Sequence, residues 1–270
     1  MKSYKRVLAI AGSDSGGGAG IQADIKSISA NGCFAASAIT AVTVQNTIGV
    51  QAVHELPADI VSGQISAVLS DIGADAIKIG MLPSADVMKA VARTIRQFHP
   101  ANIVLDPVMV ATSGDRLMSI DAVQTLKQEL MPMARVITPN IPEAEVLAGG
   151  SIREQNQLAE IAQRMAEEFH TSVLLKAGHL VGNVLTDVLY DNESRRCHFY
   201  ESARIPTLNT HGTGCTLSSA LAAQLAKGLA LPDAVGRAEH YLHQAIKEGA
   251  DYRIGHGHGP VHHFFDVYAV

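Results

Sequence analysis

Residues 210–216, with the sequence THGTGCT, carry the strongest chemical signal in the chain because small residues there open a predicted helix. Such a helix presents several backbone N–H groups without intrahelical partners at the positive end of its dipole. Gly212, Thr213, Gly214 and Cys215 could therefore form an anion hole for charge that develops on a transferring phosphoryl group. Cys215 lies in the first turn, where a thiolate is stabilised, and could take the proton from an attacking hydroxyl. The alternative is a small apolar cysteine in the core.

Two acids and a lysine lie where predicted strands end or helices begin. Asp106 follows the apolar run Ile103–Leu105, and Glu143 lies in the segment NIPE that opens a helix after another strand. Two carboxylates on one rim could hold Mg²⁺ through water, although an acid such as Glu143 is also common in a helix's first turn. Lys176 ends the run Val173–Leu175 and could reach a phosphate as a point charge. The alternative for Lys176 is a surface lysine whose stem packs on apolar neighbours.

A glycine-rich loop and two polar side chains point to a small ring as a further ligand. Residues 12–20 let backbone approach a ligand closely, but their spacing matches no dinucleotide fingerprint, and the chain has no Gly-Lys pair for a Walker A loop. Asp24 shares the apolar helix face of Ile21 and Ile28, so it must find donors: either a ligand amino group or, as an edge residue, solvent. Gln45 closes a strand of small apolar residues, and its amide could read a heterocycle edge or cap the following turn.

The elements that must position these residues alternate between strands and helices. Short apolar runs predict strands, and apolar positions three or four residues apart predict helices. The predicted strands cover residues 7–11, 35–44, 76–79, 103–108, 136–138, 173–176 and a hairpin of 184–190 with 197–203; the predicted helices cover residues 21–30, 57–72, 84–98, 119–130, 142–147, 154–169, 214–227 and 232–248. This alternation predicts an α/β fold with a mostly parallel, doubly wound sheet, whose ligands bind beyond the carboxyl ends of the strands.

The composition excludes several classes of protein. The 270 residues carry 21 basic and 26 acidic side chains, a formal charge of −5, which argues against a nucleic-acid partner. Hydrophobic residues make up 47% and charged residues 17%, which is typical of a globular chain. No stretch gives about 18 consecutive apolar residues, so we expect no membrane span. We expect one domain over residues 1–270.

The cysteines and the histidine-rich tail give no sign of a disulfide or metal framework. Cys33, Cys197 and Cys215 are odd in number and lack paired spacing, which favours a reducing cytoplasm. Residues 255–263 contain four histidines but no cysteine, so an ordered terminal loop is favoured over a metal site.

Several motifs, in order along the chain, together resemble one family. They are AIAGSDSGGGAGIQAD at 9–24, TVQNT at 43–47, KIGM at 78–81, DPVM at 106–109, TPNIPEAE at 138–145 and HGTGCT at 211–216. With these motifs the chain resembles the hydroxymethylpyrimidine/phosphomethylpyrimidine kinases of thiamine biosynthesis, in the ribokinase-like superfamily. The resemblance implies a three-layer α/β/α sandwich, the cosubstrate ATP, and Mg²⁺. It also implies phosphorylation of 4-amino-5-hydroxymethyl-2-methylpyrimidine to the monophosphate and then the diphosphate.

The resemblance also implies roles for individual residues. Gln45 and Asp24 would read the pyrimidine in a pocket with Gly12, Met81 and Val108, and Lys176 and Asn140 would bind ATP. Asp106 and Glu143 would organise Mg²⁺, and Gly212, Thr213, Gly214 and Cys215 would form the anion hole, with Cys215 as base. Most superfamily relatives carry Asp at the position of Cys215, and cysteine is typical of the pyrimidine kinases. Ala177 departs from the family's usual Lys-Gly-Gly-His, which weakens the expected phosphate contact there. We also expect a homodimer.

Two alternative functions stay open from the sequence. A pyridoxal or pyridoxine kinase on the same fold would use a similar set of residues. A catalytically silent regulator that binds a pyrimidine or nucleotide would not need the anion loop, the lysine and the two acids together, so their presence favours the kinase.

Overall fold

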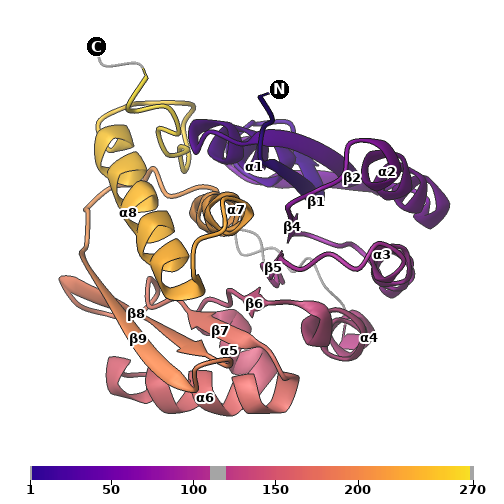
Figure 1. Cartoon of the computed structure of the whole chain (residues 1–270). Coiled ribbons are helices and arrows are strands. Elements are labelled where there is room, and N and C mark those ends of the chain that lie inside the picture. Colours follow the sequence, from indigo (N-terminus) through magenta and orange to yellow (C-terminus); the bar gives the residue numbers. More distant parts are fainter. Residues whose placement is uncertain (1, 110–119, 268–270) are drawn as a thin grey trace.

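One nine-stranded sheet runs through residues 2–109 and 120–267, the part of the chain that the computed structural model describes (Figure 1). The strands are β1 (Arg6–Asp14), β2 (Phe34–Gln45), β3 (Val50–Glu55), β4 (Ala76–Ile79), β5 (Ile103–Leu105), β6 (Val136–Ile137), β7 (Ser172–Leu175), β8 (Val184–Asp191) and β9 (Arg196–Ala203). Their order is β3-β2-β1-β4-β5-β6-β7-β8-β9. Six neighbouring strands of the sheet are parallel to one another: β2, β1, β4, β5, β6 and β7. The strands at the two edges, β3 on one side and β8 and β9 on the other, pair antiparallel. The carboxyl ends of the six parallel strands therefore meet along one rim.

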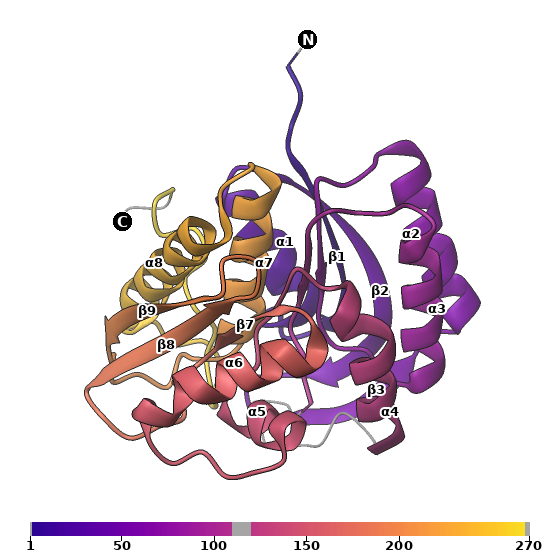
Figure 2. The same cartoon turned by 60° about the horizontal axis from the view of Figure 1, so that its bottom comes forward.

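Helices cover both faces of this sheet, which gives three layers (Figures 1 and 2). One face carries α1 (Gly20–Ala30), α7 (Thr213–Ala226) and α8 (Leu231–Gly249). The other carries α2 (Ala58–Asp71), α3 (Ala85–Arg96), α4 (Ile120–Thr125), α5 (Ile141–Ala148) and α6 (Leu158–Phe169). A π-helical turn, Leu126–Leu130, and two short 3₁₀ turns, Met131–Met133 and Gln155–Gln157, complete the elements described.

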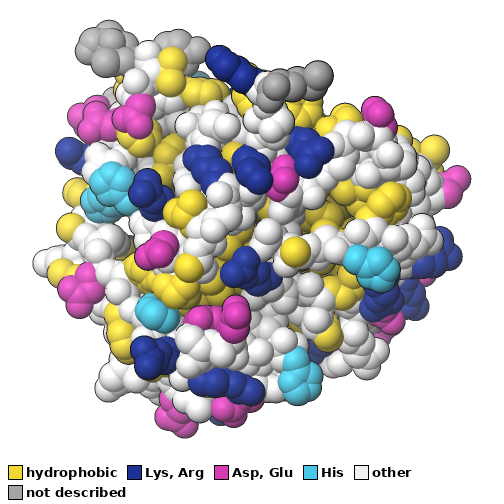
Figure 3. All heavy atoms as spheres, viewed as in Figure 1, with side chains coloured by type: hydrophobic (Ala, Val, Ile, Leu, Met, Phe, Trp, Pro, Cys, Tyr) yellow, Lys and Arg dark blue, Asp and Glu magenta, His cyan; other side chains and the backbone are white. Residues whose placement is uncertain are grey.

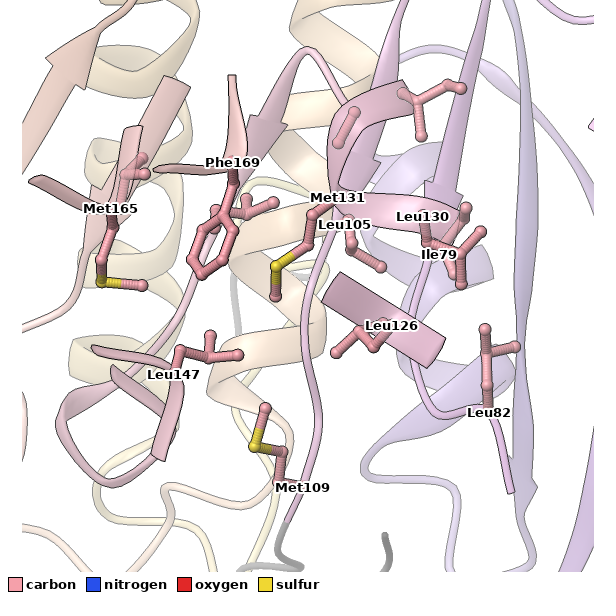
Figure 4. Packing of buried hydrophobic residues seen from close by; sticks show 14 of the residues in the cluster. Ile79, Leu82, Leu105, Met109, Leu126, Leu130, Met131, Leu147, Met165 and Phe169 are labelled. Carbon is pink, nitrogen blue, oxygen red and sulfur yellow. The ribbon is translucent and has the colours of Figure 1, made fainter. Parts of the chain in front are cut away.

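Two apolar cores result from the alternation of side chains along the central strands. In β1, Leu8 and Ile10 face the core beneath α2 to α6, whereas Val7 and Ala9 face the core beneath α1, α7 and α8. Figure 4 shows the first core, where Leu105, Met131 and Phe169 are among the packed side chains. Every residue of α7 from 216 to 226 is buried, so this helix is fixed against the sheet along its length.

Helix caps set the start of the two helices that open onto the rim. Asn140 and Glu143 form a reciprocal capping box at α5, in which each side chain accepts the other's backbone N–H. The residue before α7 is Gly212, whose φ of +79° is a left-handed conformation that glycine adopts without strain. The NIPE and HGTGCT motifs are thus helix starts, as the sequence predicts.

The predicted α/β sandwich with a mostly parallel sheet is confirmed, with local differences in the boundaries. The prediction missed β3, a mostly exposed edge strand. The strand predicted over residues 103–108 ends at Leu105, and β1 continues to Asp14. The predicted helix over residues 119–130 is split into α4 and the π-helical turn, and Ser119 lies outside the described residues.

The surface shows no large field of one charge on the face drawn in Figure 3, where acidic and basic side chains are interspersed. Among the described residues, no helix is both long and apolar enough to cross a membrane.

Candidate active site

A cavity of about 670 Å³ opens at the rim where the parallel strands end. Segments that follow these strands line it, together with the starts of α5 and α7 and parts of the β8–β9 hairpin and α8. Of the predicted site residues, the structure brings all but Asp24 together on its wall: Gly12, Gln45, Met81, Asp106, Val108, Asn140, Glu143, Lys176, Gly212, Thr213, Gly214 and Cys215.

The anion loop, residues 212–215, faces a buried ion pair. Thr216 donates its backbone N–H to the Gly212 carbonyl, so the amides of Gly214 and Cys215 have no partner within the helix. A Cβ at Gly214 would lie 3.3 Å from Asp106 Oδ2 and 3.4 Å from Lys176 Nζ. The start of α7 therefore lies directly against this ion pair. Its amides and the Lys176 ammonium line the same cavity, where they are suited to binding a phosphoryl group.

Lys176 and Asp106 are held in a fixed geometry. Lys176 Nζ lies 3.0 Å from Asp106 Oδ1, and the Thr138 hydroxyl donates to the same oxygen at 2.9 Å. Burial opposes ionisation of Asp106, but the charges of Lys176 and Lys78 outweigh it and lower the pKa of Asp106. Only 13% of the Lys176 side chain is exposed, and that part borders the cavity. The ammonium is therefore directed at the cavity without being a freely moving surface charge.

Glu143 adds a second carboxyl to this wall. Its Oε2 accepts the backbone N–H of Asn140 at 2.8 Å, which fixes the side chain beside the cavity. Burial and, to a smaller extent, the nearby charge of Asp106 raise the pKa of Glu143 to about 7, against the opposing charge of Lys176. Without a bound cation, this wall therefore carries more acid than one lysine balances. Asp106 and Glu143 are hard oxygen donors, so the residues present fit Mg²⁺.

Cys215 is half-buried at the first turn of α7, where its surroundings disfavour the ionised thiolate. Burial raises the pKa of the Cys215 thiol to about 11, although the charge of Lys78 and a hydrogen bond from the Gly20 amide oppose the shift. The thiol is therefore protonated near neutral pH in the unliganded protein.

Asp24 is not on the cavity wall, which corrects the expectation that it contacts the pyrimidine. Its side chain has no exposed surface, and its Oδ1 lies 2.7 Å from Nζ of Lys78, which is equally buried. The Ser219 hydroxyl donates to the same oxygen at 2.8 Å. The helix-edge alternative is also wrong, because the donors that Asp24 needs come from β4 and α7.

Gln45 presents a fixed amide to the cavity. Its backbone N–H donates to the Ser15 hydroxyl at 2.9 Å, and its Oε1 accepts the Thr43 hydroxyl at 3.0 Å. Its Nε2 lies 3.4 Å from Nε2 of His211. A neutral side chain with one donor and one acceptor group, held at two points, is suited to a heterocycle that also carries both kinds of group.

Asp14 connects the glycine loop with His211, the residue before Gly212, through hydrogen bonds. The Asp14 carboxylate accepts the backbone N–H groups of Gly16, Gly18 and Ala19 and lies 2.9 Å from His211 Nε2. Burial opposes the charge of Asp14, but these hydrogen bonds lower its pKa. A Cβ at Gly18 would overlap the His211 ring, and one at Gly212 would overlap the Gly18 carbonyl.

Comparison with known proteins identifies the class to which this site belongs. The family model for phosphomethylpyrimidine kinase matches residues 14–262. The chain belongs to the phosphomethylpyrimidine kinase family. It is 50% identical over 258 residues to the hydroxymethylpyrimidine/phosphomethylpyrimidine kinase of Rhizobium meliloti (strain 1021), which covers 95% of this chain and 96% of that protein.

Solved structures agree with the fold. The phosphomethylpyrimidine kinase of Clostridium difficile 630 is 39% identical with a TM-score of 0.79, over 90% of this chain and 99% of that one. An ADP complex of Bacillus subtilis pyridoxal kinase is 36% identical with a TM-score of 0.88, over 97% and 98%. The predicted family, the ribokinase-like fold and the assignment as a kinase are therefore confirmed.

Seven titratable residues on the cavity wall carry no role in the sequence interpretation: Asp14, His179, Asp187, Arg204, His211, Glu239 and His243. Asp187 accepts the backbone N–H of Ala177 at 2.7 Å and so fixes the loop after Lys176. Asp14 lies within the glycine-loop motif and His211 immediately precedes the anion loop. This position in the two motifs is the sequence signal that could have identified both residues as part of the site. The side chains of Asp187 on β8 and Glu239 on α8 share a hydrogen bond, and neither local sequence signals this contact.

Proposed function

We propose that this cavity transfers the γ-phosphoryl group of ATP to the hydroxymethyl oxygen of 4-amino-5-hydroxymethyl-2-methylpyrimidine, and then phosphorylates the monophosphate to the diphosphate. This would be a step in thiamine biosynthesis. The observation that carries the proposal is that the anion loop, Lys176 and Asp106 line the same cavity as the Gln45 amide. The similarity to the Rhizobium meliloti relative, a hydroxymethylpyrimidine/phosphomethylpyrimidine kinase, supports it.

Gln45 would read the pyrimidine ring. Its amide has one donor and one acceptor group, and the 4-amino group and ring nitrogens of the substrate offer the complementary pair. Met81 and Val108 supply apolar surface on the same cavity wall, and Gly12 leaves room for the ring. A Cβ at Gly12 would lie only 3.1 Å from Met81 Sδ, so a larger residue there would narrow the pocket.

The phosphate groups of ATP would lie between the anion loop and Lys176. The backbone N–H groups of Gly214 and Cys215 would donate hydrogen bonds to the negative charge that develops on the transferring group. The Lys176 ammonium would balance negative charge on the phosphates. Asn140, at the start of α5, borders the same space. Asp106 and Glu143 would hold Mg²⁺, which neutralises phosphate charge in this class of reaction.

Cys215 would accept the proton of the hydroxymethyl group. The bond from the substrate oxygen to the γ-phosphorus forms while the bond from that phosphorus to the ADP oxygen breaks, and ADP leaves with the electron pair. The hydroxyl proton passes to the ionised sulfur of Cys215, which later releases it to solvent. Because the thiol pKa is about 11, only a small fraction of the enzyme is ionised at neutral pH. The rate of the first phosphorylation should therefore rise with pH toward that value.

The test compares the two phosphorylations in Cys215→Ser, with products separated by mass. Serine keeps a similar size but does not form an anion readily, so the reaction of the alcohol should fall by roughly 10²–10⁴-fold. The reaction of the monophosphate should fall less, since its attacking phosphate oxygen is already ionised. Equal losses in both would assign Cys215 to the shape of the anion hole, and no loss would remove it from the mechanism.

Pyridoxal is a second candidate substrate because the Bacillus pyridoxal kinase superposes over nearly the whole chain. The same enzyme preparation should be assayed with each ring compound at matched ATP. A higher kcat/KM for pyridoxal than for the hydroxymethylpyrimidine would reverse the assignment.

Assembly and location extend this proposal. We expect a homodimer, which light scattering of the purified chain would test. We also expect the enzyme to work in the cytoplasm, which fractionation of the source cells would test.

A further inference from the structure

The mechanism above leaves one pair of fully buried charges unused, Lys78 and Asp24. Lys78 lies in β4 and Asp24 in α1, and neither side chain has any exposed surface. Their 2.7 Å contact is the shortest lysine–carboxylate distance within the described residues. Removing two charges from water has a high free-energy cost, and apolar residues of the same size often serve stability as well or better. Stabilisation of the fold alone is therefore a weak explanation for the presence of this buried ion pair.

The pair lies beneath the start of α7, on the side of Cys215. Ser219 donates to the same Asp24 oxygen that Lys78 contacts, and Ser219 follows Cys215 by four residues, so the two lie on one helix face. Gly80 shows how closely the ammonium approaches the strand end, because a Cβ at Gly80 would lie 2.6 Å from Lys78 Nζ. The next residue, Met81, already lines the cavity.

We propose that Lys78, held by Asp24, is a positioning residue for phosphoryl transfer: it provides the buried positive charge that stabilises the ionised form of Cys215. The proposal rests on the proposed function, in which the Cys215 sulfur receives the hydroxyl proton. An anion that forms in a water-poor site requires a fixed counter-charge, and an ammonium pinned by a carboxylate requires no reorganisation when that anion forms.

The charged and polar groups around Cys215 favour this role. Burial raises the pKa of the thiol, and the largest opposing effect is the charge of Lys78 from β4, followed later by the Gly20 amide of α1. Asp24 from α1 and Asp106 after β5 both act in the opposite direction. Burial lowers the pKa of Lys78, but the charges of Asp24, Cys215 and Asp106 raise it overall. Lys78 therefore stays charged beside the sulfur.

The experiment measures the ionisation of Cys215 and the first phosphorylation in the same three full-length enzymes: the native chain, Asp24→Asn, and Asp24→Asn with Lys78→Met. The double variant removes both charges at similar volume, so it avoids the unpaired buried aspartate that Lys78→Met alone would leave. Alkylation by iodoacetamide is followed against pH by mass of the peptide that contains Cys215, which separates it from Cys33 and Cys197. A matched control, Lys127→Met with Glu168→Gln, removes a pair of the same charges on the other face of the sheet.

We expect the alkylation midpoint of the double variant to lie above that of Asp24→Asn by about one pH unit or more, as a nearby charge shifts a pKa by about 1–3 units. At pH 8 the double variant should phosphorylate the alcohol about tenfold more slowly than Asp24→Asn, with a smaller change for the monophosphate. The control pair should follow the native enzyme in both measurements.

Two outcomes would overturn the proposal in different ways. Equal midpoints in the two Asp24 variants would show that Lys78 does not act on Cys215, and the proposed role of Cys215 would then stand or fall by Cys215→Ser alone. Separated midpoints with equal rates for the alcohol would show that ionised Cys215 is not the proton acceptor. In that case the fault lies in the proposed proton transfer.

Discussion

Two lysine–aspartate pairs lie at different depths below the rim of the sheet, and they differ mainly in exposure to the cavity. Lys78 contacts Asp24 at 2.7 Å with both side chains fully buried, whereas Lys176 contacts Asp106 at 3.0 Å with 13% and 3% exposed. Lys78 lies inside β4, and Lys176 is the first residue after β7. The position of each lysine relative to the end of its strand therefore decides its exposure. Lys78 is sealed between the layers, whereas Lys176 is available to a ligand in the cavity.

The balance of charge differs between the two pairs as well. The sealed pair has one acid and one base, and the further group that hydrogen-bonds to Asp24 Oδ1 is the neutral hydroxyl of Ser219. The open pair has a second acid, Glu143, on the same cavity wall. A sealed site must be neutral to be stable, while an open site can keep an excess charge for a ligand to neutralise.

Lys78→Met should give the largest effect, and the effect should be on stability. The substitution leaves Asp24 buried without its partner, which should lower the free energy of unfolding by about 3–5 kcal/mol. Urea denaturation at pH 7.5 measures it, with Lys247→Met as the control because its ion pair with Glu248 is largely exposed. That control should change stability by less than about 1 kcal/mol. Similar losses in the two variants would erase the distinction between sealed and exposed pairs.

Lys176→Met should act on activity instead. Removing the charge that we propose to balance the ATP phosphates should lower kcat/KM for ATP by roughly 10²–10³-fold. The melting temperature should fall less than in Lys78→Met, because Asp106 borders the cavity and keeps its hydrogen bond from the Thr138 hydroxyl. Lys227→Met, on the exposed end of α7, is the matched control. A variant with near-native kcat/KM but a large drop in melting temperature would place Lys176 in the same category as Lys78.

The fold was more predictable than the site because its main signal is local. Runs of Val, Ile and Leu predict the central strands, whereas β3 carries mostly exposed side chains and forms only through pairing with β2. The residues after parallel strands were found because those strand ends coincide in space. Asp24 was recognised as an anomaly on an apolar helix face, and Lys78 is an equal anomaly within AIKI. Their pairing depends on a contact across 54 residues that neither pattern contains.

Glu143→Gln tests the excess charge of the open site through the pH dependence of stability. The pKa of Glu143 is about 7 in the folded protein against an ordinary 4.5, so the folded state binds this proton more tightly. Stability should therefore fall as pH rises from about 4.5 to 7 and then level off. Glutamine does not titrate, so the stability of the variant relative to native should increase by roughly 2–3 kcal/mol between pH 5 and pH 8. Denaturant unfolding with EDTA measures this, and parallel pH curves would contradict it.

Gln45→Leu should give the smallest effect, since it removes neutral hydrogen bonds from the cavity. Leucine keeps the bulk but leaves the ring edge unpaired, at a cost of about 1–2 kcal/mol in binding. The KM for the pyrimidine should rise by about 5–30-fold, while the KM for ATP stays near native. Gln51→Leu, on the exposed strand β3, is the control. An equal rise in both KM values would mean that Gln45 does not read the ring.

The contact between Gly18 and Gly212 limits how this scaffold can be redesigned. Because a side chain at either position would overlap the opposite loop, and because Pro260 also lies 3.2 Å from a Cβ at Gly18, three distant segments behave as one unit. A glycine loop grafted from another kinase would clash with His211 or Pro260 unless the segments that contain these two residues were transferred together with it. Directed evolution of a new acceptor specificity should therefore start from the side chains around Met81 and Val108, where single exchanges are independent of that contact.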